Sequence, residues 1–290
     1  MVSVIIPTLN AEDRIRSVIE SLISQTLKPD EIIVVDSESE DNTLNICMEF
    51  QEVQIIKVKR KDFDHGGTRD MALRKSKGDI VIFLTDDAVP ANDRFIENLV
   101  RHLRSEDNIA VVSGRQTARA DATKTERLVR EFNYPLVSNI RQKSDIKTYG
   151  IKTYFCTDVC AAYDREIYLK LGGFEHPLKT NEDMFFAAAA INHGYKAGYA
   201  ADAEVVHSHN FTLKQQYRRN YIQGYEMEKH KELLGDVSAV SEGTKMVKEV
   251  SIKLLKNGDV FSFIYFGLDC LARLSGNRNG RKAALRKGEK

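Results

Sequence analysis

Apolar residues recur in two alternating patterns along the first hundred positions of the chain. Largely apolar runs occur at 2–6, 32–35, 53–58 and 80–84, which is typical of strands buried on both faces. Between them, apolar residues are spaced by three or four positions, most clearly at 15–23, and indicate amphipathic helices. This alternation predicts an α/β fold with a mostly parallel sheet that is flanked by helices.

The pattern becomes mixed after residue 109. Apolar segments predict strands at 111–113, 155–163 and 203–207, and helical spacing predicts helices at 92–104, 126–132 and 182–192. From residue 213 the composition is helical, with long helices expected at 213–234 and 245–274. We therefore expect an α/β domain over residues 1–212 and a C-terminal helical extension over 213–290, which ends in a basic tail: Arg278, Arg281, Lys282, Arg286, Lys287 and Lys290.

Composition narrows the class of protein. With 290 residues and 42% hydrophobic content, the chain can bury one large core with a smaller appendage. Its 43 basic and 42 acidic residues nearly cancel, and neither zinc-finger spacing nor a basic recognition helix is present, so we expect no nucleic-acid partner. The four cysteines lack a CxxC pair and are expected to be reduced. Because no charged leader is seen and no apolar run approaches about 18 residues, we expect a cytoplasmic protein.

Two adjacent carboxylates, Asp86 and Asp87, follow the apolar strand at 80–84. Open α/β sheets bind ligands at the carboxyl ends of their strands, and acids there are usually compensated by a cation, a base or ligand hydroxyls. The alternative is that one acid caps the next helix. Asp36 ends the second strand of the same sheet, so Asp36 and Asp87 should face one crevice, which favours a binding site.

The segment 63–69 places Gly66, Gly67 and Arg69 where a helix is expected to begin. Glycine permits close approach of the backbone, a helix N-terminus attracts anions, and arginine can donate two hydrogen bonds to phosphate. The alternative is an ordinary glycine turn with a solvated arginine. Neither a GxGxxG motif after the first strand nor a GxxxxGK[ST] motif occurs, so a nucleotide would be bound without a dinucleotide fingerprint or a P-loop.

Two further pairs carry candidate chemistry. Glu182 and Asp183 begin a predicted helix, where the helix dipole alone explains acids, but a carboxylate at a crevice rim can also act as a general base on a substrate hydroxyl. His207 and His209 end the last predicted strand and point the same way. Together with Asp87 they suit a divalent cation, the alternative being a structural role.

Taken in order, the motifs of this chain resemble those of the inverting family-two glycosyltransferases of GT-A fold over about residues 2–212. Within that family, the segments 63–69 and 83–88 are similar to bacterial rhamnosyltransferases that use dTDP-L-rhamnose. The resemblance implies a nucleotide-sugar donor and a Mg²⁺ or Mn²⁺ cofactor. The motifs that carry it are Val4-Ile5-Ile6-Pro7-Thr8-Leu9-Asn10, Val34-Val35-Asp36-Ser37, Gly67-Thr68-Arg69, Phe83-Leu84-Thr85-Asp86-Asp87, Gly172-Gly173-Phe174, Asn181-Glu182-Asp183 and His207.

The resemblance also implies roles for single residues. Asp87 with His207 or His209 would bind the metal, and Asp183, next to Glu182, would be the catalytic base. Thr8 and Asp36 would lie around the base and ribose, and Arg69 near the nucleotide. One departure is Thr85, which replaces the first acid of the usual Asp-x-Asp. The full nucleotide-contacting set expected is Pro7, Thr8, Asn10, Asp36, Ser37, Gly67, Arg69, Thr85 and Asp86.

The function expected is metal-dependent, inverting transfer of a sugar, foremost L-rhamnose from dTDP-L-rhamnose, to a hydroxyl of a cell-surface polysaccharide or lipid-linked glycan. The alternatives are a family-two transferase that uses a UDP-sugar and a non-catalytic nucleotide-sugar-binding partner, the latter disfavoured by the candidate base. A sugar-phosphate nucleotidyltransferase is also disfavoured, because Pro7-Thr8-Leu9-Asn10 is not a glycine-rich loop with a basic residue.

The C-terminal region has two open interpretations. Large apolar residues at 261–274 followed by the basic tail are what a helix on an anionic membrane surface needs, which would place the protein on the inner face of the cell membrane. A homodimer interface or a core-packing helix is equally compatible, since Asp269 interrupts the apolar surface.

Overall fold

The structure is a computed structural model that describes residues 1–235, 237 and 240–288. Within this part, the strands are β1 Val2–Thr8, β2 Glu31–Asp36, β3 Val53–Lys57, β4 Ile80–Leu84, β5 Val89–Pro90, β6 Ile109–Thr117, β7 Asn139–Arg141, β8 Cys160–Asp164 and β9 Lys196–Val206. The helices are α1 Ile15–Ile23, α2 Thr43–Met48, α3 His65–Lys75, α4 Phe95–Leu103, α5 Lys124–Asn133, α6 Ile146–Tyr149, α7 Arg165–Lys170, α8 Glu182–Asn192, α9 Leu213–Lys229, α10 Lys231–Leu234, α11 Val240–Lys256 and α12 Val260–Gly288.

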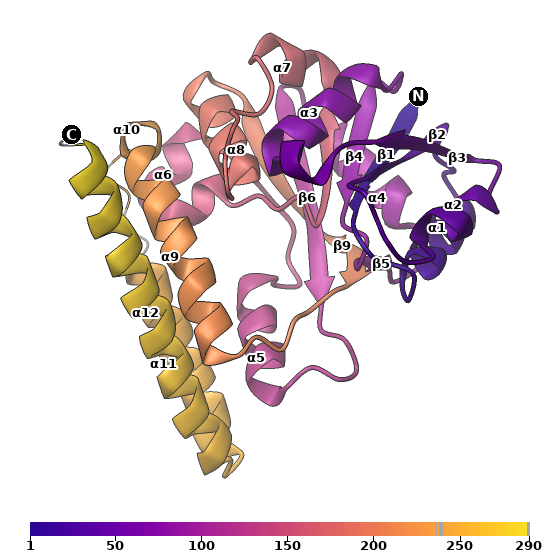
Figure 1. Ribbon diagram of the computed structural model, residues 1–290. Helices are drawn as coiled ribbons and strands as arrows, with labels where there is room; N and C mark the ends of the chain where they lie inside the picture. Colours follow the sequence, from indigo (N-terminus) through magenta and orange to yellow (C-terminus); the bar gives the residue numbers. More distant parts are fainter. Residues whose placement is uncertain (236, 238–239, 289–290) are drawn as a thin grey trace.

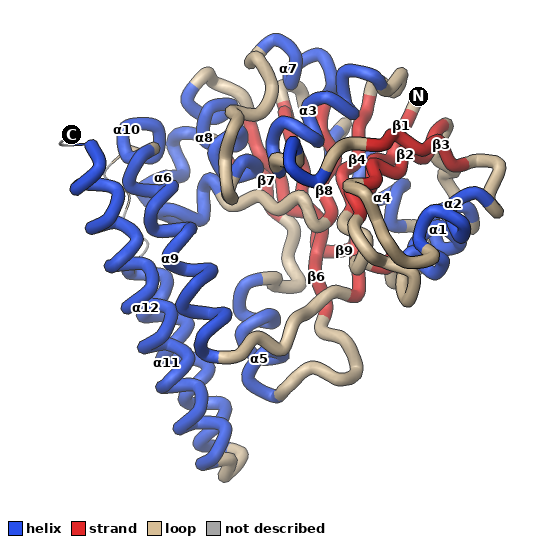
Figure 2. The backbone as a smooth tube through the Cα atoms, viewed as in Figure 1, coloured by secondary structure: helices blue, strands red, loops and turns tan. Residues whose placement is uncertain are grey.

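The described strands form one mixed sheet in the order β3-β2-β1-β4-β8-β6-β9-β5, with β7 paired to β9 (Figures 1 and 2). Strands β1 to β4 run parallel to one another, as the first hundred residues predict. Strand β8 runs antiparallel to both β4 and β6, whereas β9 is parallel to β6. The predicted α/β fold is confirmed, and its carboxyl-end crevice is shared by the parallel half and by β6 and β9.

Alternate residues of the strands pack into two apolar layers. Val4 and Ile6 of β1 face the helices α1, α2 and α4, while Ile5 between them faces α3, α7 and α8. Because side chains of a strand alternate between its two faces, a continuous apolar run is required where helices cover both faces. This is the reason that the pattern of the first hundred residues identifies the fold so directly.

The C-terminal helices form a separate layer against one side of the sheet domain (Figure 1). Helices α9 and α12 lie side by side, and Gly276 and Gly280 of α12 face the backbone of Tyr217 and Tyr221 so closely that a side chain at either glycine would overlap it. A third apolar cluster joins α5 to α11 and α12 through Val129, Val250, Leu254 and Phe266. The extension is therefore packed onto the α/β part at α5.

Several predicted element boundaries are wrong. The strand expected at 155–163 is confined to Cys160–Asp164, and the last strand begins at Lys196 rather than at residue 203. The helix expected at 245–274 is interrupted where Gly258 adopts a positive φ of 66°, which glycine tolerates readily. The basic tail continues α12 up to Gly288, and Lys290 lies outside the described residues.

The four cysteines are free, as expected, and Cys47, Cys156 and Cys160 are buried. No helix in the described ranges combines the length and the apolar character that crossing a membrane requires.

Candidate active site

Asp86 and Asp87 occupy the centre of a tight turn at the end of β4, in which the Ala88 N–H donates to the Thr85 carbonyl at 3.1 Å. The turn directs the two carboxylates toward different partners. Helix α4 begins only at Phe95, without a side-chain cap from either acid, so the capping alternative is wrong. Adjacent acids thus have separate environments, which their sequence positions do not reveal.

Asp86 is turned toward the first strand. Its Oδ2 accepts a hydrogen bond of 2.9 Å from the Thr8 hydroxyl, and its Oδ1 lies 3.4 Å from Nε of Arg14. Burial raises the pKa of Asp86, which Arg14 and Thr8 partly offset by stabilising the charged form. Asp86 therefore bridges the carboxyl ends of β1 and β4.

Asp36 ends β2 directly beside Thr8, its partner in the sheet register. One carboxylate oxygen, Oδ2, accepts from the Ser39 N–H at 3.1 Å. The other, Oδ1, is buried and has no hydrogen-bond partner among the described residues, and the same holds for the hydroxyls of Ser37 and Thr85. Buried polar atoms are normally paired, so these atoms mark a place where a ligand donor or acceptor fits.

The other predicted nucleotide contacts lie at the same edge or help to shape it. Pro7 precedes Thr8 in β1, and Asn10 adopts a positive φ of 50° while its N–H donates to the Ser39 hydroxyl. The Gly67 N–H, in contrast, donates to the Asp64 carboxylate that caps α3, at 2.6 Å. The first turn of α3 is therefore capped by the chain itself.

Asp87, His207 and His209 form a cluster, the Asp87–histidine cluster, whose ligand atoms all lie within 4.8 Å of one another. Nε2 of His207 is 3.4 Å from Asp87 Oδ1, and Nε2 of His209 is 3.3 Å from Oδ2. Although burial opposes it, His207 holds the pKa of Asp87 well below its usual range. Burial, helped by His207, lowers the pKa of His209 to about 4, so its imidazole is neutral at pH 7.

Gln116 of β6 orients His207, because its side-chain carbonyl accepts from Nδ1 at 2.9 Å. The same oxygen accepts from Arg130 at 2.6 Å, which holds the amide in place. With Nδ1 bound to Gln116, Nε2 is the ring nitrogen that faces Asp87 and is placed to bind a cation. This is the arrangement in which an outer hydrogen bond fixes the tautomer of a metal-binding histidine.

The donor set of the Asp87–histidine cluster fits the divalent cation that the sequence motifs imply. One carboxylate and two imidazoles converge there, and carboxylate oxygen and neutral imidazole nitrogen are forms in which side chains bind a metal. Imidazole nitrogen suits transition ions, whereas Mg²⁺ prefers an all-oxygen shell.

Asp183, in the first turn of α8, is half-buried at the crevice. Its Oδ2 accepts from the Asp158 N–H at 3.0 Å and its Oδ1 from the Met184 N–H at 2.7 Å, so its orientation is set by backbone. Burial, and next the charge of Glu182, raise the pKa of Asp183 to about 7. A carboxylate with a pKa near neutrality is well matched to accept a proton from a hydroxyl.

Arg69 does not point toward solvent, where it could bind a phosphate group. Its Nη1 lies 3.0 Å from Glu182 Oε1 and its Nε lies 3.5 Å from Asp158 Oδ2, with all three side chains buried. This geometry therefore does not favour the roles expected of the two residues, which were a nucleotide contact for Arg69 and a catalytic role for Glu182. The structure gives both residues an internal ion pair that supports the start of α8.

The sequence pattern does not identify two residues of the site. Asp158 falls within a predicted apolar strand, yet it lies in the turn before β8, where its carboxylate accepts a hydrogen bond of 2.6 Å from the Tyr163 hydroxyl. Gln116 lies in β6, which the apolar pattern predicts only as far as residue 113. The signal that could have identified Asp158 and Gln116 is a polar side chain in or beside an apolar segment, because such side chains are rarely buried without a partner.

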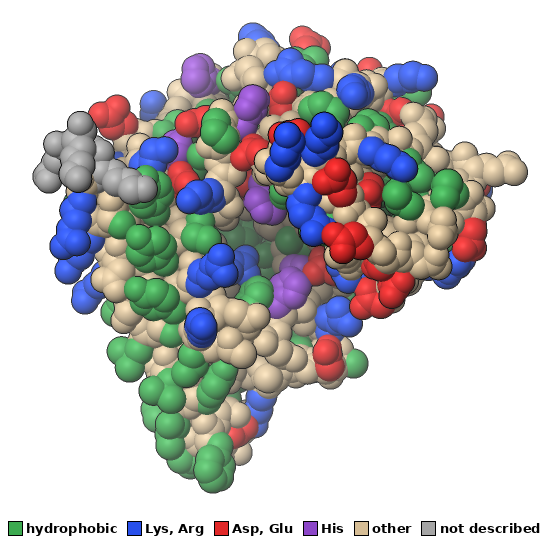
Figure 3. Space-filling model, in the orientation of Figure 1, with side chains coloured by type: hydrophobic (Ala, Val, Ile, Leu, Met, Phe, Trp, Pro, Cys, Tyr) green, Lys and Arg blue, Asp and Glu red, His purple; other side chains and the backbone are tan. Residues whose placement is uncertain are grey.

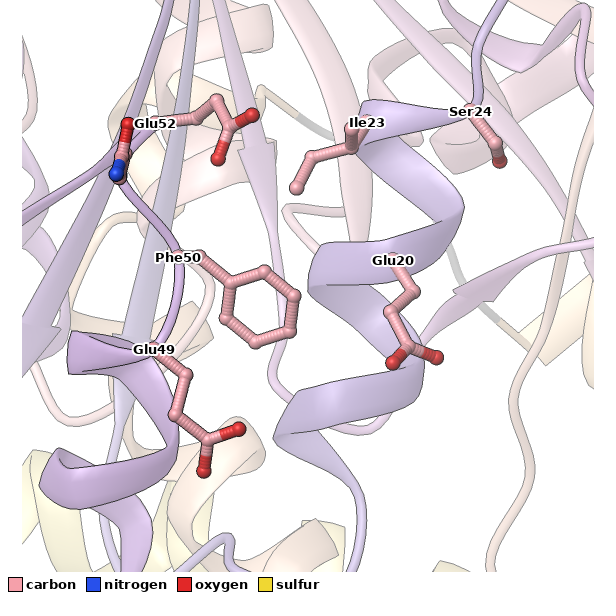
Figure 4. A pocket seen from close by; sticks show the side chains of 7 residues that line it. Glu20, Ile23, Ser24, Glu49, Phe50 and Glu52 are labelled. Carbon is pink, nitrogen blue, oxygen red and sulfur yellow. The ribbon is translucent and has the colours of Figure 1, made fainter.

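A separate depression lies away from the crevice. A volume of about 470 Å³ opens between the end of α1 and the segment that enters β3, lined by Phe50 and by Glu20, Glu49 and Glu52 (Figure 4). These segments meet the amino ends of the parallel strands, opposite the crevice, and Glu49 is paired with Arg16 at 2.7 Å. Ligands of open α/β sheets bind at the other edge.

The family model described as "Glycosyl transferase family 2" matches residues 3–172, which is more than half of the chain. The chain belongs to glycosyltransferase family 2. The expectation of a glycosyltransferase is confirmed, and with it the family resemblance read from the motifs.

This family-2 transferase is 39% identical over 258 residues to the O-antigen chain rhamnosyltransferase RfbN of Salmonella typhimurium, covering 88% of this chain and 82% of the relative. It is 38% identical to the O-antigen chain rhamnosyltransferase WbaN of Salmonella anatum, with coverage of 88% and 81%.

Solved structures share the fold of the transferase. A mannosyltransferase from Pyrobaculum calidifontis in complex with GDP-Man and Mn²⁺ superposes with a TM-score of 0.64 at 18% identity, over 95% of this chain and 86% of that one. TarS of S. aureus in complex with UDP-GlcNAc gives a TM-score of 0.57 at 16% identity, over 99% and 92%. The expected GT-A fold is thereby confirmed.

Proposed function

We propose that this transferase moves L-rhamnose from dTDP-L-rhamnose to a hydroxyl of a cell-surface polysaccharide or a lipid-linked glycan precursor, and inverts the anomeric centre. Residues 1–212 would form the donor-binding and catalytic domain, and residues 213–290 a helical extension. The two relatives named as O-antigen chain rhamnosyltransferases support the sugar, because they match over most of their own length at 39% and 38% identity. The carboxyl-end crevice supports the reaction.

Donor binding would use the open acceptors at the ends of β1 and β2. The unpaired Oδ1 of Asp36 can accept from a ring N–H or a ribose hydroxyl, beside the Thr8–Asp86 bridge. The Asp87–histidine cluster would hold the divalent cation next to the diphosphate. When bound, such a cation offsets the charge that grows on the leaving diphosphate.

The proton of the acceptor hydroxyl would pass to Asp183. The pKa of about 7 makes its carboxylate basic enough to accept a proton and still ionised in a large fraction of molecules at neutral pH. The backbone bonds from Asp158 and Met184 fix the direction of the carboxylate. As the hydroxyl oxygen attacks the anomeric carbon in line with the departing diphosphate, a single displacement inverts that carbon.

The observation that carries this proposal is the coexistence of a base with raised pKa and a three-residue cation site at one sheet edge. Its test is a binding and hydrolysis screen, with Mn²⁺ or Mg²⁺, of dTDP-L-rhamnose, UDP-glucose, UDP-galactose, UDP-N-acetylglucosamine and GDP-mannose. We expect selective use of dTDP-L-rhamnose and a larger response to Mn²⁺. Selective use of a UDP-sugar would refute the rhamnose assignment, and binding without any turnover would favour the non-catalytic alternative.

The C-terminal helices would rest on an anionic membrane surface from the cytoplasmic side, which brings a lipid-linked acceptor within reach. Exposed residues of α12 recur at intervals of three and four, apolar at Phe261, Ile264, Leu268 and Leu271 and basic at Arg278, Lys282 and Arg286. Figure 3 shows this apolar stripe on the outer side of the helices. An apolar face that continues into positive charge complements anionic lipid, whereas a homodimer through it would bring basic residues together.

This placement is tested by flotation of the protein with vesicles that contain anionic or only zwitterionic lipid. Phe261, 90% exposed, makes the best probe. We expect binding to anionic vesicles and a marked loss of it in Phe261→Ser combined with Leu268→Ser. A concentration-dependent dimer that the same double variant dissociates, without vesicle binding, would assign the face to a second copy instead.

A further inference from the structure

Three arginines from three different helices surround the crevice next to the Asp87–histidine cluster. Arg130 of α5 pairs with Glu126 at 2.5 Å, and Arg273 of α12 pairs with Asp269 at 2.6 Å. Among the described residues, no carboxylate lies within ion-pair distance of Arg219, although its charge interacts with those of Arg130 and Arg273. The positive charge of Arg219 is therefore uncompensated, beside two other positive charges.

Arg219 reaches toward the cluster over an aromatic ring. It is exposed on α9, and its guanidinium carbon lies 5.2 Å from the centre of the Phe211 ring. Phe211 is in turn 5.0 Å, ring to ring, from His209. A small cleft of about 110 Å³, which Arg219 does not line, lies beside it between His209, Phe211 and Arg273 and also contains Glu126 and Asp269.

Tyr134 of the segment after α5 links Arg219 electrostatically to the candidate base. Burial raises the pKa of Tyr134, the charges of Arg130 and Arg219 oppose that shift, and Asp183 adds to it. Tyr134 is thus within electrostatic range of both Arg219 and Asp183. Figure 3 shows histidine and Lys or Arg side chains gathered around a hollow in this face of the molecule.

We propose that Arg219 binds the diphosphate of the nucleotide-sugar donor, and this rests on the proposed function. An arginine on an aromatic face, without its own carboxylate and next to a cation site, is suited to the bidentate recognition of phosphate oxygens. The role expected of Arg69 passes to Arg219 because Arg69 is held by Glu182 and Asp158. The helical extension thereby contributes to the donor site.

The contribution to the reaction follows from where the charge moves. The bond between the anomeric carbon and the diphosphate oxygen breaks with its electron pair on that oxygen. The acceptor oxygen forms the new bond and its proton goes to Asp183. Arg219 donates hydrogen bonds to the diphosphate, which gains negative charge in this step, and so binds the departing group more strongly than the intact donor.

The test measures the affinity of the full chain for dTDP, UDP and GDP by calorimetry with saturating Mn²⁺. Using whichever nucleoside diphosphate the wild type binds, we expect Arg219→Ala to weaken binding about tenfold or more, and Arg219→Lys to recover part of the loss. Arg218→Ala removes the same charge from the neighbouring exposed position of α9 and should change affinity by less than about twofold. Circular dichroism confirms that the variants are folded.

The outcomes separate this inference from the proposed function. If the wild type binds no nucleoside diphosphate, the proposed function fails. If it binds one and Arg219→Ala binds it equally well, only the role of Arg219 is refuted. If Arg219→Ala keeps its nucleotide affinity but raises the KM for a diphosphate-linked lipid acceptor, the anion site belongs to the acceptor and the donor assignment is overturned.

Discussion

The ion cluster of Arg69, Asp158 and Glu182 and the Asp87–histidine cluster are built from similar charged groups, but they differ in what they leave free. In the first, one arginine lies buried between carboxylates that approach it from α8 and from the turn before β8. In the second, a carboxylate and two imidazoles converge, with their ligand atoms all within 4.8 Å of one another. The first cluster is a support, and the second can take a ligand.

The comparison also explains the raised pKa of Asp183, the candidate base. Arg69 faces three carboxylates, those of Asp158, Glu182 and Asp183, so negative charge exceeds positive charge in a region with little water. Burial raises the pKa of Asp158 and of Asp183, because the charged form is poorly solvated, and the neighbouring carboxylates raise it further. In the proposed reaction, the supporting cluster would tune Asp183 for proton transfer, and the open cluster would hold the cation beside the leaving group.

The largest effect is expected from Asp183→Asn, which removes the proton acceptor and keeps the shape of the side chain. Turnover should fall about 10²- to 10⁴-fold while donor affinity stays near that of the wild type. Steady-state kinetics and calorimetry on the same preparation measure both. Unchanged turnover with intact binding would remove Asp183 from the role of base.

Arg69→Met should mainly affect stability, because it leaves Asp158 and Glu182 buried without their cation. Breaking a buried pair in this way lowers the free energy of unfolding by about 3–5 kcal/mol. Urea denaturation measures it, with Arg94→Met as control, since Arg94 forms an exposed pair with Glu97 that should contribute less than about 1 kcal/mol. A variant as stable as the control would mean that the ion cluster is not a support.

Gln116→Leu tests the open cluster through the hydrogen bond that orients His207. Loss of such an outer bond should weaken Mn²⁺ affinity about 10- to 100-fold, and excess Mn²⁺ should restore most of the turnover. Titration of Mn²⁺ followed by donor-dependent activity gives both numbers. Equal Mn²⁺ affinity in the wild type and the variant would contradict a metal role for His207.

The pH dependence of turnover should report the raised pKa of Asp183. Because the base must be ionised, kcat should rise with pH and level off above an apparent pKa of about 7, giving about a tenfold loss one unit below it. Since the folded protein binds this proton more tightly than the unfolded chain, the contribution of Asp183 to the free energy of unfolding should decrease as pH rises from about 4 to 7. Asp183→Asn should flatten that decrease.

The sequence by itself determined the α/β fold, the elements of the first hundred residues and the candidate chemistry. Residues 2–6 and 80–84 identify buried strands because burial on both faces requires every position to be apolar. Asp36, Asp87 and Asp183 stand out because acids at the ends of such elements need a compensating partner. These signals are local, so they can be read without knowing which segments meet.

Only the tertiary structure decided which of the charged residues are free. The turn at Asp86 and Asp87 separates two adjacent acids, and the pairing of β8 with β4 brings Asp158 to Arg69, 89 positions away in the chain. The path of the chain from β9 into α9 places the Phe211 ring between Arg219 and His209. Whether a charge is neutralised depends on contacts between distant segments, and no local pattern in the sequence contains that information.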